Sequence, residues 1–207
     1  PRSRYQSEVE AVDREMGRLL DGLRPGAVRR PRVVAVVADH GESFGEHGES
    51  EHGYLLHTPT LAVPLVLAGP GVPTARLQAA GVGIRRLPAT LARLAGVNAA
   101  KLGGPAIELA NPGATPAVAV YHETEFPAST FGWSPLAAVT RGDWRFVSGP
   151  HPALYDLATD PQQLVNRVRD EPDHHRREQD ESDREEQDRT GVGPEVPDRR
   201  EVGRREE

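Results

Sequence analysis

The run PRVVAVVAD, residues 31–39, constrains the fold more than any other part of this chain. It is short, continuously apolar and rich in β-branched Val, which is typical of a strand buried on both faces in a parallel sheet that helices cover. A second run of this kind, VPLVLAG, follows at residues 63–69. Helical patterns at residues 7–24 and 85–96 alternate with these runs. The alternation predicts an α/β fold with a mainly parallel sheet.

The first helical pattern, SEVEAVDREMGRLLDGLR, predicts an amphipathic helix. Its apolar residues recur at steps of three and four: Val9, Val12, Met16, Leu19, Leu20 and Leu23. We expect Ser3 or Ser7 to cap its start and the Pro-Gly pair at residues 25–26 to end it. The second pattern, RRLPATLARLAG, predicts a short helix closed by Gly96.

Short strands without helices between them follow from residue 117. AVAVYHE, residues 117–123, has the pattern of a strand, and LAAVTRGDWRFVSG, residues 136–149, that of a hairpin turned at residues 141–143. We therefore divide the chain into an α/β domain at residues 1–116, a small antiparallel subdomain at 117–169 and a charged tail at 170–207.

The tail carries most of the net charge. It has 15 acidic residues and eight Arg, a balance of −7 within a chain of net charge −6, and no Leu, Ile or aromatic residue. Such a segment buries too little apolar surface to offset its ordering entropy, which predicts disorder. A solvated single helix over residues 173–189 is the alternative, because opposite charges recur there at helical spacing. The adjacent His174 and His175 are metal-competent, but in a charged tail we expect them to be solvated.

Composition excludes several classes of function. The 207 residues contain no Cys, so they hold neither a disulfide nor a thiolate metal site, and the redox compartment stays open. The sign of the tail argues against binding nucleic acid. No apolar run reaches the roughly 18–20 residues of a membrane span, and no export signal opens the sequence.

The stretch ADHGESFGEHGESEHG, residues 38–53, is the strongest candidate for a functional site, with four Glu and three His directly after the first strand. In open α/β sheets, ligands bind outside the carboxyl ends of the strands, where Asp39 and His40 emerge. A carboxylate and an imidazole together suit Mn²⁺, Zn²⁺ or, less typically, Ca²⁺. The alternative from the residues alone is a capping Asp beside an exposed His.

The order of these motifs resembles the sulfatase family of the alkaline-phosphatase superfamily. ADHGESFGEHGESEHG followed by VPLVLAGPGVP is similar to that family's Asp-His-Gly-Glu metal loop, its later His-Gly and its Val-Pro-Leu strand. LPATLARLAGV resembles its Pro-Thr-Leu helix, and FGWSPLAAVTRGDWRFVSGPHPALYDLATDP its C-terminal subdomain. The Gly-Trp-Ser-Pro form is similar to sulfatases that carry tetratricopeptide repeats. The resemblance covers roughly residues 5–168 and implies part of an alkaline-phosphatase-like sandwich.

The resemblance also implies roles for particular residues. Asp39 and His40 would be ligands of one divalent cation, Ca²⁺ or Mn²⁺, and His52 would be a catalytic group reaching the ester or its leaving oxygen. Glu42 would support these groups by hydrogen bonding, whereas His47 and His57 are expected to be solvated or structural. The substrate would be a sulfate ester or a related anionic ester. The family's compartments include the exterior and the membrane, and these residues do not choose among them, nor do they indicate an oligomeric state.

Departures from the family pattern limit this interpretation. His57, Thr58 and Pro59 stand where Tyr and an acidic residue are usual, and Gln162 and Gln163 where an acidic residue often follows the Asp-Pro. The family's formylglycine nucleophile, made from Cys or Ser in a Cys/Ser-x-Pro-x-Arg motif, and its early acidic pair lie far upstream and are absent from these residues. We therefore expect a C-terminal portion of a sulfatase, inactive by itself.

Two other functions stay open. A phosphoester hydrolase or phosphoethanolamine-type transferase of the same superfamily would share the Asp-His-Gly-Glu loop and use an upstream Thr as nucleophile. A noncatalytic domain, whose charged tail contacts partners, is the second alternative. The residue type of the upstream nucleophile discriminates among all three.

Overall fold

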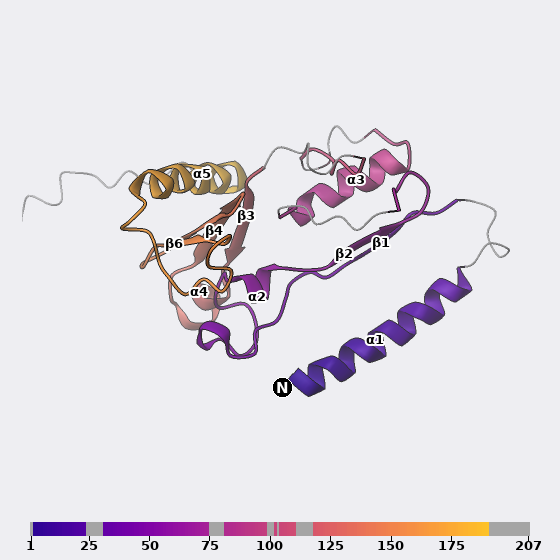
Figure 1. The fold of residues 1–207 in the computed structure, drawn as a ribbon, viewed down its shortest axis with the longest axis horizontal. Helices are drawn as coiled ribbons and strands as arrows, with labels where there is room; N and C mark the ends of the chain where they lie inside the picture. The colour runs from indigo at the N-terminus through magenta and orange to yellow at the C-terminus, as the bar shows by residue number, and fades with distance from the viewer. Residues whose placement is uncertain are drawn as a thin grey trace, which may run out of the picture.

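The computed structural model describes residues 2–23, 31–74, 81–98, 102, 104–110 and 118–190, as Figure 1 shows. An N-terminal part contains the long helix α1 (Arg2–Gly22), the strands β1 (Val34–Val37) and β2 (Leu65–Ala68), and the helices α2 (Thr58–Leu61) and α3 (Leu87–Leu94). A C-terminal part contains a four-stranded sheet and two helices. Helices and strands thus mix as the α/β class predicts.

The first two strands pair with each other in antiparallel orientation, from Val34 opposite Ala68 to Val37 opposite Leu65. The prediction of a mainly parallel sheet is therefore wrong for these two strands. The apolar run indicated burial but did not encode strand direction. The expected burial on both faces is also missing, because β1 is only half-buried and Val66 in β2 is 57% exposed.

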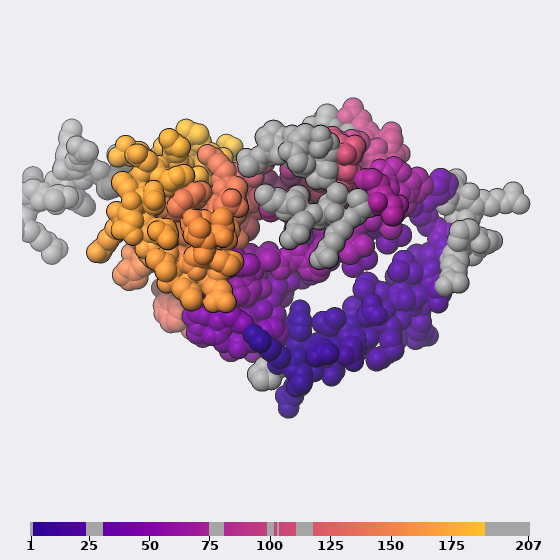
Figure 2. Space-filling view, viewed as in Figure 1, coloured from indigo at the N-terminus to yellow at the C-terminus, as the bar shows by residue number. Residues whose placement is uncertain are grey.

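Helix α1 lies at one side of the molecule, and its apolar face is uncovered by the described residues. Val9, Val12, Leu19 and Leu20 are exposed, and Figure 2 shows open space between the middle of α1 and the β1–β2 ribbon. Near the start of the helix, the Tyr5 ring contacts the Phe44 ring edge to face, with centroids 5.2 Å apart. The helix begins at Arg2, so neither Ser3 nor Ser7 is its cap; Ser7 Oγ instead donates to the Ser3 carbonyl inside the helix. The Pro-Gly pair lies outside the described residues.

Helix α3 ends before Gly96, as predicted, and Gly96 has the left-handed φ of 69° that a closing glycine adopts. Its buried Thr90 accepts a hydrogen bond from the Ile107 N–H at 2.8 Å, and the 3₁₀ turn η2 (Ile84–Arg86) precedes it. These contacts tie residues 105–110 to the helix.

The C-terminal sheet is entirely antiparallel, in the order β3 (Val120–Thr124), β4 (Leu136–Arg141), β5 (Trp144–Ser148) and β6 (Ala153–Asp156). The predicted hairpin is confirmed, because Arg141 pairs with Trp144 across the turn. Helix α4 (Phe126–Phe131) connects β3 to β4. The core here is tightly closed, and four apolar side chains are fully buried: Ala138, Val139, Phe146 and Leu154.

Helix α5 (Pro172–Thr190) corrects the prediction of disorder for this part of the tail. It packs against β4 and β5 (Figure 1): the His174 ring stacks on Trp144 at 4.3 Å between centroids, and His175 lies 5.2 Å from Phe146. The two histidines are therefore packed on aromatic rings. Two ion pairs of 2.7 Å also hold the helix, one from Arg141 of β4 to Glu181 and one from Arg85 of η2 to Glu185. The alternative of a helix is confirmed over Pro172–Thr190, but the expectation that it is solvated is wrong, because Glu178 and Ser182 are buried against the sheet. Residues 191–207 lie outside the described part.

None of the helices in the described ranges is both long enough and apolar enough to cross a membrane.

Candidate active site

The candidate site lies on the loop that follows β1, and the loop rests against α2. The Gly41 N–H donates to the Thr60 carbonyl at 2.8 Å. A Cβ atom at Gly41 would lie 2.1 Å from the Pro59 carbonyl oxygen, so only glycine fits this approach. The glycine of the Asp-His-Gly motif thus lets the backbone after His40 pack directly on α2.

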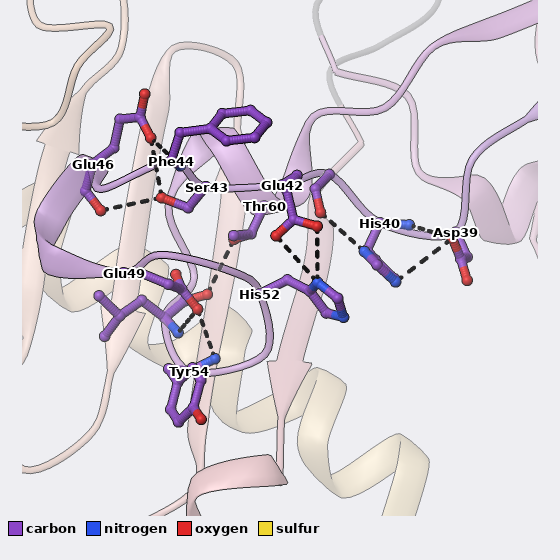
Figure 3. Close-up of polar contacts among 12 residues, drawn as sticks. Asp39, His40, Glu42, Ser43, Phe44, Glu46, Glu49, His52, Tyr54 and Thr60 are labelled. Atoms are coloured by element: carbon purple, nitrogen blue, oxygen red, sulfur yellow. Dashed lines mark hydrogen bonds and ion pairs between the residues drawn. The ribbon is translucent and has the colours of Figure 1, made fainter. Parts of the chain in front are cut away.

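Asp39 and His40 lie side by side at the end of β1 (Figure 3). The His40 N–H donates to Asp39 Oδ1 at 3.0 Å, and His40 Nδ1 lies 2.9 Å from the Gly41 carbonyl oxygen. A ring whose Nδ1–H donates to a carbonyl presents Nε2 as a free lone pair, which is the usual arrangement of a metal-binding histidine. That Nε2 lies 3.8 Å from Asp39 Oδ1, and the Asp39 side chain is 90% exposed.

His52 folds back onto the same place. Its ring stacks on the His40 ring with centroids 3.9 Å apart, and its Nδ1 lies 3.3 Å from both carboxylate oxygens of Glu42. Figure 3 shows Glu42 reaching down to His52 from the loop. Glu42 therefore supports the predicted catalytic ring and does not bond His40. A carboxylate at Nδ1 orients the ring and leaves Nε2 for another partner.

Two other acidic residues of the loop accept hydrogen bonds from its backbone. Glu49 is 5% exposed, and its Oε1 accepts from the N–H groups of Tyr54 and Leu55 at 2.8 and 3.2 Å. Glu46 Oε2 accepts from the Phe44 N–H at 2.6 Å, and this bond is the main reason that the pKa of Glu46 falls to about 2. Sequence reasoning missed both roles, because the motif singles out only Glu42 among the four Glu of the stretch.

His47 and His57 do not join this group of residues. Their rings stack on each other at 3.7 Å, nearly parallel, and His57 also lies 5.7 Å from the Tyr155 ring. Burial, and then the nearby His47 and Arg145, lower the pKa of His57 to about 4. His57 is therefore neutral at physiological pH and structural, as expected.

Asp39 and His40 are spaced as two ligands of the predicted cation would be. Ligands of one ion lie roughly 3–4 Å apart when their bonds to it are about 2.0–2.6 Å long, and the 3.8 Å between Asp39 Oδ1 and His40 Nε2 fits this spacing. Within the described residues, however, no cluster of three or more His, Cys, Asp or Glu is arranged to hold a metal ion. Asp39 and His40 fit as two ligands of an ion, and the described residues supply no third ligand of these types beside them.

Comparison with known proteins identifies the segment that carries this loop. Residues 1–97 match the family model described as Sulfatase. This segment is sulfatase-like. A curated relative named Sulfatase, from Formosa agariphila, is 34% identical over 95 residues, which are 46% of this chain and 18% of that protein. The recognition of the sulfatase family from the sequence motifs agrees with these matches.

Solved structures share the fold of the sulfatase-like segment and of the sheet that follows it. An enzyme solved with its substrate D-glucosamine-2-N,6-O-disulfate aligns with a TM-score of 0.67 at 23% identity, over 87% of this chain and 39% of its own. The phosphonate monoester hydrolase of Agrobacterium radiobacter aligns with a TM-score of 0.63 at 24% identity, over 82% of this chain and 38% of its own. The chain therefore spans well under half of these proteins.

Proposed function

We propose that this chain is part of a longer, metal-dependent sulfatase-like hydrolase that cleaves sulfate monoesters. The observation that carries the proposal is the meeting of Asp39, His40 and His52 at the end of β1, in the segment that matches the sulfatase family. The short coverage of the relatives supports the further proposal that the remaining cation ligands and the formylglycine nucleophile belong to the rest of the protein. By itself this chain would be inactive.

Each residue of the site has a distinct part in this proposal. Asp39 Oδ1 and His40 Nε2 would hold Ca²⁺ or Mn²⁺, and a bound cation would stabilise negative charge that develops on the sulfate oxygens. His52 would donate its Nε2 proton to the departing alcohol oxygen. Glu42, 3.3 Å from His52 Nδ1, would orient the ring and stabilise its charge until that proton leaves.

The class of substrate is proposed from two supports: the sulfatase match and the sulfated sugar bound by a structural neighbour. The FGWSPL stretch supports the narrower proposal of a sulfatase associated with tetratricopeptide repeats. The fold shared with a phosphonate monoester hydrolase favours the phosphoester alternative. Turnover of aryl sulfate and aryl phosphate by the longer protein, measured side by side, discriminates: we expect sulfate turnover, and phosphate turnover without sulfate turnover would replace this function with the alternative.

Metal affinity tests the proposed sharing of ligands. Two ligands cannot satisfy a cation that prefers about six or more, so the 207-residue chain should bind Mn²⁺ and Ca²⁺ weakly and the longer protein much more tightly. Calorimetric titration of both proteins measures this difference. Tight binding by the 207-residue chain would show that the ligands are assigned to the wrong residues.

A further inference from the structure

The geometry points to Arg145 and Gln163 as positioning residues for the Asp39–His40 loop. They lie in the C-terminal part, more than 100 residues from the loop in sequence, and act through α2. We infer that they hold α2 by its first residue, Thr58, and that α2 in turn holds Gly41. Only the consequence for catalysis rests on the proposed function, because the chain of contacts is a property of the fold.

The C-terminal side of this connection is buried. Arg145 is 6% exposed and Gln163 is 2% exposed. Arg145 Nη1 donates to Thr58 Oγ1 at 2.9 Å and to Gln163 Oε1 at 3.2 Å, and its Nε donates to Thr140 Oγ1 at 2.9 Å. Gln163 Oε1 also accepts from the Thr58 N–H at 2.7 Å. An otherwise unpaired N–H at the start of α2 is thus satisfied by a side chain from the other part of the molecule.

The positive charge of Arg145 makes its contact with Thr58 and Gln163 depend on the oxygen acceptors that these residues supply. Burial lowers the pKa of Arg145 to about 10, so the guanidinium is still protonated at neutral pH. Its hydrogen bonds among the described residues go to three neutral oxygens, those of Thr58, Thr140 and Gln163. A buried cation needs hydrogen-bond acceptors, because leaving a buried charge without them costs more free energy than leaving a neutral group without them. Gln163 supplies only its oxygen, since its buried Nε2 has no partner.

The other end of α2 reaches the site. Helix α2 is only four residues long, and Thr60 Oγ1 pins it by donating to the Leu55 and His57 carbonyls, both at 3.1 Å. The Thr60 carbonyl accepts from Gly41, and the Gly41 carbonyl lies 2.9 Å from His40 Nδ1. A shift of α2 therefore moves the backbone that sets the orientation of the His40 ring.

Amide hydrogen exchange on the 207-residue chain tests this connection without any assumption about activity. In Arg145→Met and in Gln163→Leu we expect the amides of Gly41 and Thr58 to exchange at least tenfold faster. The amides of Val139 and Phe146, in the centre of the C-terminal sheet, should stay protected and show that the sheet is folded. Arg141→Met is the matched control: it removes an Arg from the neighbouring strand whose partners are Glu178 and Glu181 on α5.

Two milder variants keep the test decisive if Arg145→Met unfolds the sheet. Thr58→Val removes one acceptor of Arg145 and should accelerate Gly41 exchange, whereas Gln163→Glu keeps the oxygen acceptor and should leave it within about twofold of the wild type. Unchanged Gly41 exchange in folded Gln163→Leu and Thr58→Val, or equal acceleration in Arg141→Met, would overturn the inference. In the longer enzyme, Gln163→Leu should lower kcat and weaken metal binding while Gln163→Glu retains both. Absence of sulfate turnover would reject the proposed function and leave the exchange result standing.

Discussion

The two parts of this molecule differ in how completely they bury their own apolar residues. In the C-terminal sheet, Phe146 and Leu154 are fully buried and α5 covers one face. In the N-terminal part, Val66 is 57% exposed and Leu19 of α1 is 63% exposed. The C-terminal part closes around fully buried side chains, whereas in the part that carries the candidate site the buried apolar residues, such as Leu56, Leu87 and Ile107, leave Val66 and α1 exposed.

Two side-chain truncations, one in each part, test this comparison and have the largest expected effect on stability. Phe146→Ala should lower the free energy of unfolding by about 3–5 kcal/mol, because it leaves a cavity in a closed core. Val66→Ala should change it by less than about 0.5 kcal/mol, since the removed methyl groups already face solvent. Urea unfolding followed by Trp144 fluorescence measures the first, and circular dichroism the second. Equal losses would contradict the difference between the two parts.

Acid should destabilise the folded protein through two partly buried histidines, one in each part. Burial, and then the charge of Arg145, lower the pKa of His122 to about 3, and its Nε2 lies 3.0 Å from Thr140 Oγ1. Below pH 6.5 the unfolded chain binds a proton on this ring that the folded chain does not, so stability falls as the pH drops, by up to about 1.4 kcal/mol per pH unit. The lowered pKa of His57, about 4, adds to the same slope.

The measurement for this prediction is the urea midpoint between pH 7 and 5. A His122→Gln variant, which cannot titrate and can still hydrogen-bond Thr140, should show a shallower dependence on pH by about one proton. The same slope in both proteins would exclude His122 as the source.

The smallest expected effect concerns α5. Glu178 is 4% exposed, its Oε2 has no hydrogen bond, and Arg141 is 4.0 Å from its other oxygen. Burial raises the pKa of Glu178 above its ordinary value of 4.5. The folded state therefore favours the protonated carboxyl, and the charged form costs stability at neutral pH. Glu178→Gln should stabilise the protein at pH 7 by less than about 1 kcal/mol, and thermal unfolding should show that gain shrink as the pH falls toward 4.5. A loss at pH 7 would mean that the Arg141 pair outweighs burial.

Local patterns predicted the elements better than their pairing. The turn at Arg141 and the end of α3 at Gly96 follow from a few adjacent residues, and both were predicted. The antiparallel pairing of β1 with β2 was not, since an apolar run has no direction. Helix α5 was given only as an alternative, because it docks by stacking His174 on Trp144 and by ion pairs, without the aliphatic stripe that the pattern requires.

The candidate site was likewise predicted where neighbouring residues determine it and missed where distant residues meet. Asp39 and His40 could be proposed because they follow a strand, and His52 because the stretch resembles the sulfatase loop; the structure brings the three together. The buried pair of Arg145 and Gln163 could not, because it meets Thr58 only after the two parts have packed. Gln163 stands where the family often has an acidic residue, and this departure was the one signal in the sequence that pointed to the pair.

The central claim is that Asp39 holds a cation in a sulfate-ester hydrolase, and steady-state turnover of an aryl sulfate by the longer protein tests it most directly. We expect Asp39→Ala to be more damaging than His52→Ala, which should cost on the order of 10²- to 10⁴-fold, because stabilisation of developing charge usually contributes more to the rate of ester cleavage than one proton transfer does. Glu51→Ala, on the same exposed loop, is the matched control and should be close to wild type. Full activity in Asp39→Ala would contradict the account.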